Sequence, residues 1–397
     1  TFYKVRILKL EDKKMATIFY SVSGEGMGHS TRSEVVINHL LAQGHELVLF
    51  SYDRSFDYLY DSFKTNKKVL DFVKISGINF VYEKNNFKLG KTIIRESTKI
   101  SPLLIKNTSV FLDMMLKYNP SLIITDFEPI SNRIAKLVGI PLICIDNINF
   151  ITKCEIDKKF RNSILKQFTK HILRFNGNFN FITAVFDVPL KKKYESNTYL
   201  VGPIIGDCFK DAKITDKNFV LVYQTTGSND KLIDILKQSD EKYIIYGFNK
   251  DHTDKNLTFK KQSRKGFVKD LISCKAVIAN AGFTLISEAV TLKKPIYSIP
   301  VKRQIEQEIN GHYIAKSGYG LYSKEINSSD LRHFLDNLTK YRKELSKVNY
   351  DAGKLFKLLD EKIDYLTDKY KKASKLKVML KIKEIYNTKI WDLRKSD

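Results

Sequence analysis

Residues 23–30 constrain the fold of this chain more than any other segment. They read Ser-Gly-Glu-Gly-Met-Gly-His-Ser and lie between an apolar run at 16–20 and an amphipathic run at 35–41. This order predicts a strand, a glycine-rich turn and the start of a helix. Glycine permits positive φ angles and a close approach of the backbone to a ligand. The helix N-terminus favours an anion, and His29 at the mouth of the turn could take a proton or face a phosphate.

A second turn of this kind lies at residues 280–284, Asn-Ala-Gly-Phe-Thr, after another apolar run. We expect the N–H groups of Gly282, Phe283 and Thr284 to hold a diphosphate. Glu288 lies one helical turn further on, where a carboxylate can accept both hydroxyls of a ribose. An ordinary capped helix with a surface glutamate is the other interpretation. Two such turns in two halves of one chain predict a cleft between two nucleotide-binding-like domains.

Apolar runs of strand length alternate with longer amphipathic segments along most of the chain. This alternation predicts parallel sheets with helices on both faces, with a ligand beyond the carboxyl ends of the strands. The strands expected in the first half are 17–22, 46–50, 122–125, 142–145, 180–184 and 198–201, and the helices are 31–42, 91–117, 130–138 and 158–173. The strands expected in the second half are 219–223, 243–246, 276–279 and 296–299, and the helices are 231–237, 267–273, 285–291, 306–316 and 330–343.

A length of 397 residues exceeds one ordinary core and predicts two domains. We place the first at 15–203, a linker at 204–218 and the second domain at 219–345. Residues 346–397 predict a basic helical tail whose first part packs back on the first domain. We interpret residues 1–14 as an extension before the first strand.

The formal net charge is +24, from 68 basic and 44 acidic residues. Such an excess favours an anionic partner, either a membrane surface or double-stranded DNA. An AT-rich coding sequence also raises the lysine content with no partner implied. No apolar run approaches the roughly 20 residues that span a bilayer, and no secretory signal pattern is recognised. We expect a cytoplasmic protein, with a peripheral position on the inner face of the membrane as an option.

Residues 300–310 add polar side chains at helical spacing. Gln304, Gln307 and Glu308 recur along one stretch, with Asn310 beyond them. Amides and carboxylates bind sugar hydroxyls well because they offer paired donors and acceptors. By itself this pattern fits a solvated helix face equally well, but it follows the turn at 280–284 and therefore indicates a sugar site.

Two motifs together resemble a known family. Asn-Ala-Gly-Phe-Thr-x-x-Ser-Glu at 280–288, then Lys-Pro, Ile-Pro and Glu-Gln-x-x-Asn at 306–310, are similar to the donor half of GT-B glycosyltransferases of the MurG-like and UDP-glycosyltransferase-like group. Gly-Glu-Gly-Met-Gly-His-x-x-Arg at 24–32 resembles the N-terminal loop of a little-characterised archaeal and bacterial branch, often labelled teichoic-acid-related. The resemblance extends from Met15 to about Gly320.

The resemblance implies an α/β fold of the GT-B type, in which two Rossmann-like parallel-sheet domains face a cleft. It implies an inverting hexosyltransferase with a UDP-sugar as donor substrate and no permanently bound cofactor. No Asp-x-Asp motif stands in a suitable loop, and helix N-termini can relieve the charge of the leaving diphosphate, so we expect no metal. At position 281 this chain has alanine, where members of the family often have glycine. Alanine there leaves room for a phosphate but narrows the turn.

The resemblance also assigns roles to single residues. His29 is the implied base or phosphate partner, although Glu25 in the same loop leaves that role open. Asp126 ends a strand and either orients His29, binds the acceptor or caps a helix; Asp146 and Asn147 end the next strand with the same ambiguity. The other implied site residues belong to the loop around the histidine (Gly26, Gly28), the phosphates (Thr226, Gly227, Ser228, Gly282, Phe283, Thr284), the ribose (Glu288), the base (Phe267, Val268) and the sugar (Gln304, Glu306, Gln307).

The sequence is compatible with two classes of acceptor, a lipid-linked or cell-envelope molecule and DNA. A lipid-linked or cell-envelope acceptor is favoured, because lysines and apolar residues alternate in the tail and would dock on anionic lipid. The first alternative is a DNA glycosyltransferase acting on a flipped hydroxymethylated base. The second is a UDP-sugar epimerase of the same fold, which would release a free isomer. A binding module without activity is disfavoured by Glu288 and residues 306–307. A dinucleotide site is disfavoured because His29 replaces the third glycine of that fingerprint.

Overall fold

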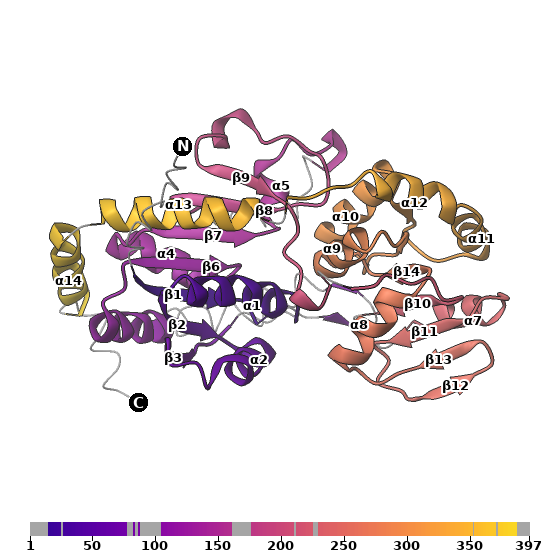
Figure 1. The fold of residues 1–397 in the computed structure, drawn as a ribbon, viewed down its shortest axis with the longest axis horizontal. Coiled ribbons are helices and arrows are strands. Elements are labelled where there is room, and N and C mark those ends of the chain that lie inside the picture. The colour runs from indigo at the N-terminus through magenta and orange to yellow at the C-terminus, as the bar shows by residue number, and fades with distance from the viewer. Residues whose placement is uncertain are drawn as a thin grey trace, which may run out of the picture.

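The computed structural model describes residues 15–24, 27–77, 82–83, 86–87, 105–160, 176–209, 212–224, 229–351, 353–370 and 372–386. These residues form two α/β halves that lie next to each other (Figure 1). Each half is built on a seven-stranded sheet. The predicted sheets with helices on both faces are therefore confirmed.

The first sheet has the strand order β3-β2-β1-β6-β7-β8-β9, and its neighbouring strands are all parallel. The chain order changes direction between β1 and β6, so the loops after these two strands border a crevice. The strands are β1 (Thr17–Val22), β2 (Glu46–Ser51), β3 (Val69–Lys74), β6 (Leu122–Asp126), β7 (Leu142–Asp146), β8 (Phe179–Thr183) and β9 (Thr198–Val201). The helices of this half are α1 (Met27–Ala42), α2 (Asp53–Phe63), α4 (Pro129–Val138), α5 (Asn149–Lys153) and a helix over 105–118.

The second sheet has the order β12-β13-β11-β10-β14-β15-β16, with β12 antiparallel to β13 and the other pairs parallel. Its switch point lies between β10 and β14. The strands are β10 (Val220–Tyr223), β11 (Tyr243–Tyr246), β12 (His252–Asp254), β13 (Leu257–Phe259), β14 (Ala276–Ala279), β15 (Ile296–Ser298) and β16 (Gly320–Tyr322). The helices are α7 (Asp230–Lys237), α8 (Arg264–Ser273), α9 (Phe283–Thr291), α10 (Ile305–Lys316), α11 (Ser328–Asp336) and α12 (Leu338–Ser346).

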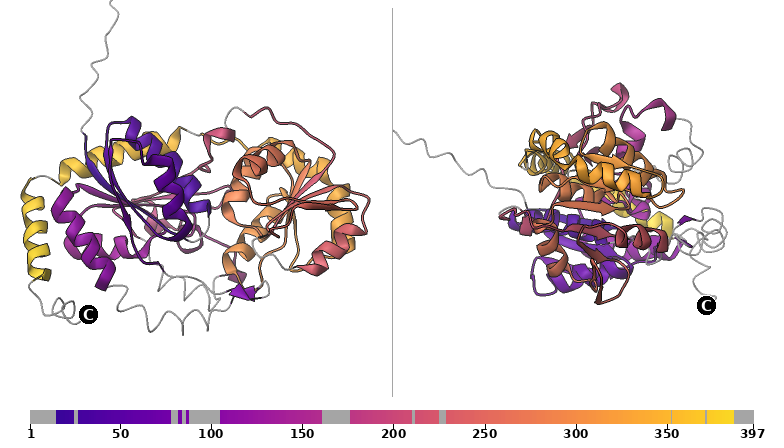
Figure 2. Two further views of the ribbon diagram at one scale, coloured as in Figure 1. Left: turned by 90° about the horizontal axis from the view of Figure 1, so that it is seen from below. Right: turned by 90° about the vertical axis from the view of Figure 1, so that its right-hand side faces the viewer.

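The last two helices return to the first half (Figures 1 and 2). Helix α13 (Lys354–Lys369) places an apolar stripe against β1, α1 and the strands beside them. Helix α14 (Lys372–Tyr386) packs on α4 and stands at the outer end of the first half (Figure 2). The buried stripe of α13 recurs every three or four residues, as an amphipathic helix requires: Leu355, Leu359, Ile363 and Leu366.

An aromatic contact joins the two halves away from the sheets' switch points. Tyr313 of α10 lies edge-on to Phe150 of α5, with ring centroids 5.6 Å apart, and also contacts Phe186. Beside it, Nε2 of His312 lies 2.7 Å from Asp157 of the first half. The halves therefore share a packed core as well as a chain connection.

Some elements differ from the prediction. The structure adds the helices α2 and α5 and six strands: β3, β4 (Tyr82–Glu83), β5 (Asn86–Phe87), β12, β13 and β16. It also divides the helix expected at 330–343 into α11 and α12 at Asn337. Helix α1 begins at Met27, four residues earlier than expected. Residues 1–14 and parts of the expected helices 91–117 and 158–173 lie outside the described residues. Within the described part of the chain, no helix is both long and apolar enough to cross a membrane.

Candidate active site

A cavity of about 650 Å³ lies where the switch points of the two sheets face each other. Its walls come from the N-terminal turns of α1, α8, α9 and α10, so that four helix starts point at one space. Each helix start carries unpaired N–H groups and a partial positive charge, which favours an anionic ligand. The four helix starts therefore favour an anionic ligand in this cavity.

Helices α1 and α9 approach each other closely at their first turns. A Cβ atom added to Gly28 would lie 2.3 Å from Oγ1 of Thr284, so only glycine fits there. Neither Gly28 nor Gly282 has a positive φ angle; the left-handed residue of the second turn is Ala281, with φ 61°. Positive φ, one use of glycine expected in the first turn, is therefore not found at Gly28, which instead permits close contact between the two halves.

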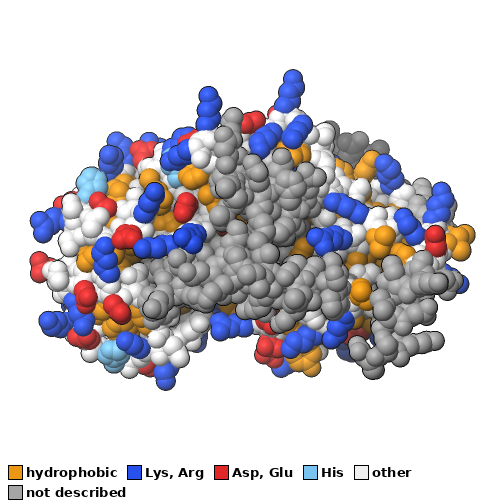
Figure 3. Space-filling model, turned by 180° about the vertical axis from the view of Figure 1, so that it is seen from behind, with side chains coloured by type: hydrophobic (Ala, Val, Ile, Leu, Met, Phe, Trp, Pro, Cys, Tyr) orange, Lys and Arg blue, Asp and Glu red, His pale blue; other side chains and the backbone are white. Residues whose placement is uncertain are grey.

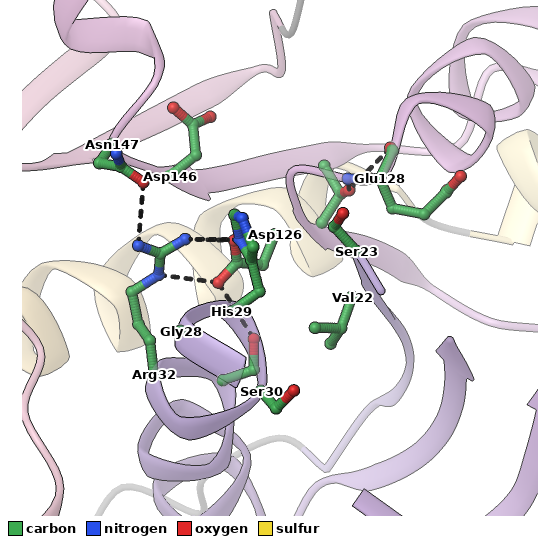
Figure 4. Close-up of polar contacts among 12 residues, drawn as sticks. Val22, Ser23, Gly28, His29, Ser30, Arg32, Asp126, Glu128, Asp146 and Asn147 are labelled. Carbon is green, nitrogen blue, oxygen red and sulfur yellow. Dashed lines mark hydrogen bonds and ion pairs between the residues drawn. The ribbon is translucent and has the colours of Figure 1, made fainter. Parts of the chain in front are cut away.

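His29 lies on the first turn of α1 and faces the cavity. Its Nδ1 is 2.8 Å from Oδ1 of Asp126, at the end of β6 (Figure 4). Its ring stacks on Phe127, with centroids 5.3 Å apart and an angle of 8° between the planes. Nη2 of Arg32 also lies 3.0 Å from Nδ1. An ionised carboxylate can only accept, so we place the proton of the shorter bond on Nδ1; Arg32 then donates to Asp126 and not to the ring, and Nε2 is left as the acceptor.

Asp126 is fully buried and held by several donors. Arg32 reaches Oδ2 through Nε at 2.8 Å and Oδ1 through Nη2 at 2.5 Å, and Ser33 donates to Oδ2 at 3.1 Å. Burial acts to raise the pKa of Asp126, but the charges of Arg32 and His29 outweigh it and lower the pKa to about 2. Asp126 therefore stays ionised beside His29 at any pH near neutral.

The helix cap that was one interpretation of Asp126 belongs to Glu128. The carboxylate of Glu128 accepts from the N–H groups of Ile130 and Ser131 at the start of α4. Asp146 accepts from the backbone and side-chain N–H groups of Asn149, the first residue of α5, although the N-cap position of this helix is Ile148. Burial raises the pKa of Asp146 to about 6.

Asn147 and Glu306 connect the two halves inside the cavity. Nη1 of Arg32 donates to Oδ1 of Asn147 at 3.1 Å, and Nδ2 of Asn147 donates to Oε1 of Glu306 at 2.8 Å. Burial raises the pKa of Glu306, against the hydrogen bond from Asn147 and the charges of His29 and Arg32. Glu306 thus lies within electrostatic reach of the His29 site.

Glu288 pairs with an arginine that the sequence did not single out. Nη2 of Arg264, at the start of α8, lies 2.9 Å from Oε1 of Glu288. The carboxylate is nearly buried, and burial raises its pKa despite the charge of Arg264. Gln304 and Gln307 both line the cavity at the start of α10. The side-chain oxygen of Gln307 accepts from the backbone N–H of Val301.

An aromatic wall closes the second-half side of the cavity. Phe267 makes edge-to-face contacts with Tyr223 and Tyr246, at centroid distances of 5.5 and 5.3 Å. Such a wall can cover the face of a base. Phe267 lines the cavity as expected, but Val268 packs against the core and does not line it.

The structure thus gathers most of the expected residues around one space. Gly28, His29, Phe267, Gly282, Phe283, Thr284, Glu288, Gln304, Glu306 and Gln307 line the cavity. Glu25, Gly26, Thr226, Gly227 and Ser228 lie outside the described residues. Sequence reasoning gave no role to several further lining residues, which carry no local motif: Arg54, Tyr223, Gln262, Ser263 and Arg264.

Comparison with known proteins agrees with this architecture. A glycosyltransferase of Phytolacca americana, UGT2, solved with UDP-2-fluoro-glucose and pterostilbene, matches with a TM-score of 0.63 at 14% identity, over 88% of this chain and 99% of that chain. The UGT89C1 protein of Arabidopsis thaliana, solved with UDP-L-rhamnose, matches with a TM-score of 0.59 at 13% identity, over 94% and 99%. These likenesses establish the GT-B arrangement of the two halves.

The chain is a nucleotide-sugar glycosyltransferase of the GT-B fold. Residues 16–339 match the model of glycosyl transferase family 1, and the chain belongs to that family.

Two sequence relatives add to this assignment. An uncharacterized glycosyltransferase of Methanosarcina mazei is 25% identical over 380 residues, which cover 85% of this chain and 94% of that protein. A UDP-N-acetylglucosamine–N-acetylmuramyl-(pentapeptide) pyrophosphoryl-undecaprenol N-acetylglucosamine transferase of Clostridium botulinum is 32% identical over 129 residues, covering 28% of this chain and 35% of that protein.

Proposed function

We propose that this enzyme transfers a hexose from a UDP-sugar to a hydroxyl group with inversion, using His29 as base. The observation that carries the proposal is the 2.8 Å contact between His29 Nδ1 and Asp126. It lies beside the first turns of α1 and α9, where the leaving diphosphate would be stabilised. Solved proteins of similar fold hold UDP-linked sugars, which supports UDP as the carrier.

The proposed step begins with the acceptor hydroxyl against Nε2 of His29. Nε2 takes the proton while the acceptor oxygen bonds to the anomeric carbon of the sugar. The bond from that carbon to the diphosphate oxygen breaks, and UDP leaves with the electron pair. Asp126 stabilises the imidazolium, which later gives its proton to solvent. Four helix starts supply the charge relief, and this supports a reaction that requires no metal.

We further propose that the acceptor is lipid-linked and lies at an anionic membrane surface. The Clostridium botulinum relative acts on a pyrophosphoryl-undecaprenol acceptor, a lipid. In this chain, α14 buries Val378 and Ile382 but leaves Leu376 and Leu380 63% and 57% exposed. Exposed leucines between lysines suit the interface of an anionic bilayer. Among residues 376–385, where the structure describes the side chains of this helix, the exposed lysines are Lys377, Lys381 and Lys383.

On the visible face opposite to that of Figure 1, the described basic side chains form no single stripe. On the face shown in Figure 3, lysines and arginines are scattered over both halves of the described surface. A duplex DNA ligand favours a continuous basic track on one face. The scattered pattern supports the lipid proposal over the DNA alternative.

Changing both exposed leucines of α14 to asparagine tests the membrane surface. We expect the wild-type protein to sediment with vesicles of phosphatidylglycerol but not of phosphatidylcholine. The variant Leu376→Asn/Leu380→Asn should bind at least tenfold more weakly, because two apolar side chains no longer enter the interface. The control is Ile214→Asn, which changes a comparably exposed side chain in the chain segment that connects β9 with β10. Equal binding by all three proteins would contradict this surface.

The transfer reaction itself is tested with labelled donors. A pool of radiolabelled UDP-sugars is incubated with the enzyme, a lipid extract and DNA containing hydroxymethylcytosine or hydroxymethyluracil. Label in the organic phase is the expected result. Label in the DNA would show that DNA and not lipid is the acceptor. Release of a free UDP-sugar isomer would show that the enzyme epimerises the donor and does not transfer its sugar.

A further inference from the structure

A chain of hydrogen bonds crosses from the donor-side half to the base. Glu306, at the start of α10, accepts from Nδ2 of Asn147, and Oδ1 of Asn147 accepts from Nη1 of Arg32. Arg32 then holds Asp126 through Nε and Nη2, and Asp126 accepts from His29 (Figure 4). The chain links the residue expected to bind the donor sugar with the residue expected to take the proton.

The chemistry of each group fixes the direction of these bonds. A guanidinium only donates, and a carboxylate only accepts. Between Arg32 and Glu306, a single side chain must therefore accept on one side and donate on the other. The amide of Asn147 does both, with its oxygen toward Arg32 and its nitrogen toward Glu306.

Burial strengthens these hydrogen bonds. Arg32 is 4% exposed, Asp126 is fully buried and Asn147 is 9% exposed. Charge-assisted hydrogen bonds away from solvent are stronger and more exacting in geometry than surface bonds. The three planar groups cannot move separately without leaving a buried charge or amide without its partner.

We propose that Arg32 and Asn147 are positioning residues, through which closure of the donor-side half onto Asn147 fixes Asp126 and His29 for proton transfer. This inference rests on the proposed function. Glu306 reaches Asn147 only while the halves are together, so the base is held in place in the closed enzyme. A displacement of about 1 Å at a catalytic group costs on the order of a hundredfold in rate.

The test compares Asn147→Ala and Asn147→Asp with the wild-type enzyme in sugar transfer from pH 5.5 to 8.5. We expect Asn147→Ala to lower kcat about ten- to hundredfold. Its affinity for UDP, measured by calorimetry, should stay within about twofold, because UDP has no sugar to meet Glu306.

Asn147→Asp supplies a readout that a general loss of packing would not give. Its carboxylate faces Glu306 and Arg32 and adjoins Asp146, with His29 nearby. Two facing carboxylates cannot both ionise cheaply, so one proton is shared at low pH. The variant should therefore gain at least tenfold in kcat between pH 8.5 and pH 5.5, relative to the wild-type profile.

The matched control is Asp157→Asn, which removes a contact between the halves outside the cavity. Asp157 pairs with His312 at 2.7 Å and Lys316 at 2.6 Å. Its kcat and pH profile should stay close to those of the wild type. The inference would be overturned if both Asn147 variants kept the wild-type kcat and pH profile. It would also be overturned if Asp157→Asn lost as much kcat as Asn147→Ala. A wild-type enzyme that binds UDP-sugar but transfers nothing would instead overturn the proposed function.

Discussion

Asp126 is the residue around which the site is built. It is fully buried, yet it is ionised because Arg32, Ser33 and His29 all donate to it. Its neighbours come from α1, and its backbone comes from β6, so the pair His29–Asp126 forms only in the folded first half. The position of Asp126 after a strand could be predicted from the sequence, but its four donor contacts could not.

His29→Ala removes the proposed base. We expect transfer to fall about 10²- to 10⁴-fold, because general base catalysis contributes that much. UDP binding, measured by calorimetry, should change little, since the proposed phosphate contacts come from the helix starts. The control is His252→Ala on the edge strand β12, which should leave transfer unchanged. Near-normal turnover of His29→Ala would show that another group is the base.

Asp146 should make stability depend on pH in the direction opposite to an ordinary aspartate. Its folded pKa is about 6, above the usual 3.8, so its favourable contribution is present below 3.8 and lost as the pH rises through 6. Asp146→Asn should therefore raise the free energy of unfolding by up to about 3 kcal/mol at pH 8, and by progressively less toward pH 4. Urea unfolding at several pH values measures this. The exposed Asp240→Asn should show no such trend.

At the scale of elements, the candidate site depends on the residues at which the helices around it begin. The prediction placed α1 from residue 31, because Gly26, Met27 and Gly28 precede an apolar periodic run and glycine disfavours helix. The structure begins α1 at Met27, where contact with α9 and the anchoring of Arg32 on Asp126 outweigh local propensity.

Most central strands could be predicted because they are continuous apolar runs. The edge strands β3 and β12 could not, since their side chains are half exposed or polar. Arg264 and Tyr223 were missed for a related reason. Neither belongs to a local motif, and only the topology of the second sheet brings them to the cavity.

Gly28→Ala tests the contact between α1 and α9. The added methyl would lie 2.3 Å from Thr284 Oγ1, so the helix starts must separate. We expect transfer to fall at least tenfold. The helix preference of alanine, about 1 kcal/mol over glycine, should offset only part of the stability lost as the two helix starts separate, so the melting temperature should fall modestly. Gly206→Ala is the control, since its methyl would meet nothing closer than 3.4 Å. A fully active Gly28→Ala enzyme would contradict a close approach during catalysis.

At the scale of the molecule, α13 makes the first half depend on the end of the chain. Its apolar stripe completes the core over β1 and α1, and its residues follow the whole second half in sequence. The amphipathic pattern of this segment could be predicted from the sequence. Which face of which sheet it covers depends on the path of the chain after α12.

Leu359→Ala should destabilise the first half by about 2–5 kcal/mol, because Leu359 is fully buried and alanine leaves a cavity. Denaturant unfolding, followed by hydrogen exchange in β1 and in β10, should show the loss in β1. Lys357→Ala, at an exposed position of the same helix, is the control. Equal protection of β1 in both variants would show that α13 is not part of that core.

The return of α13 also means that the polypeptide passes between the halves twice, once after β9 and once after α12. A body attached at one point can swivel freely, whereas a body attached at two points turns mainly about the line that joins them. Two connections would therefore restrict the relative rotation of the two halves mainly to one axis. In the proposed closure, Glu306 would return each time to the same partner, Asn147, and a protease that cuts either passage alone would leave the two halves joined by the other.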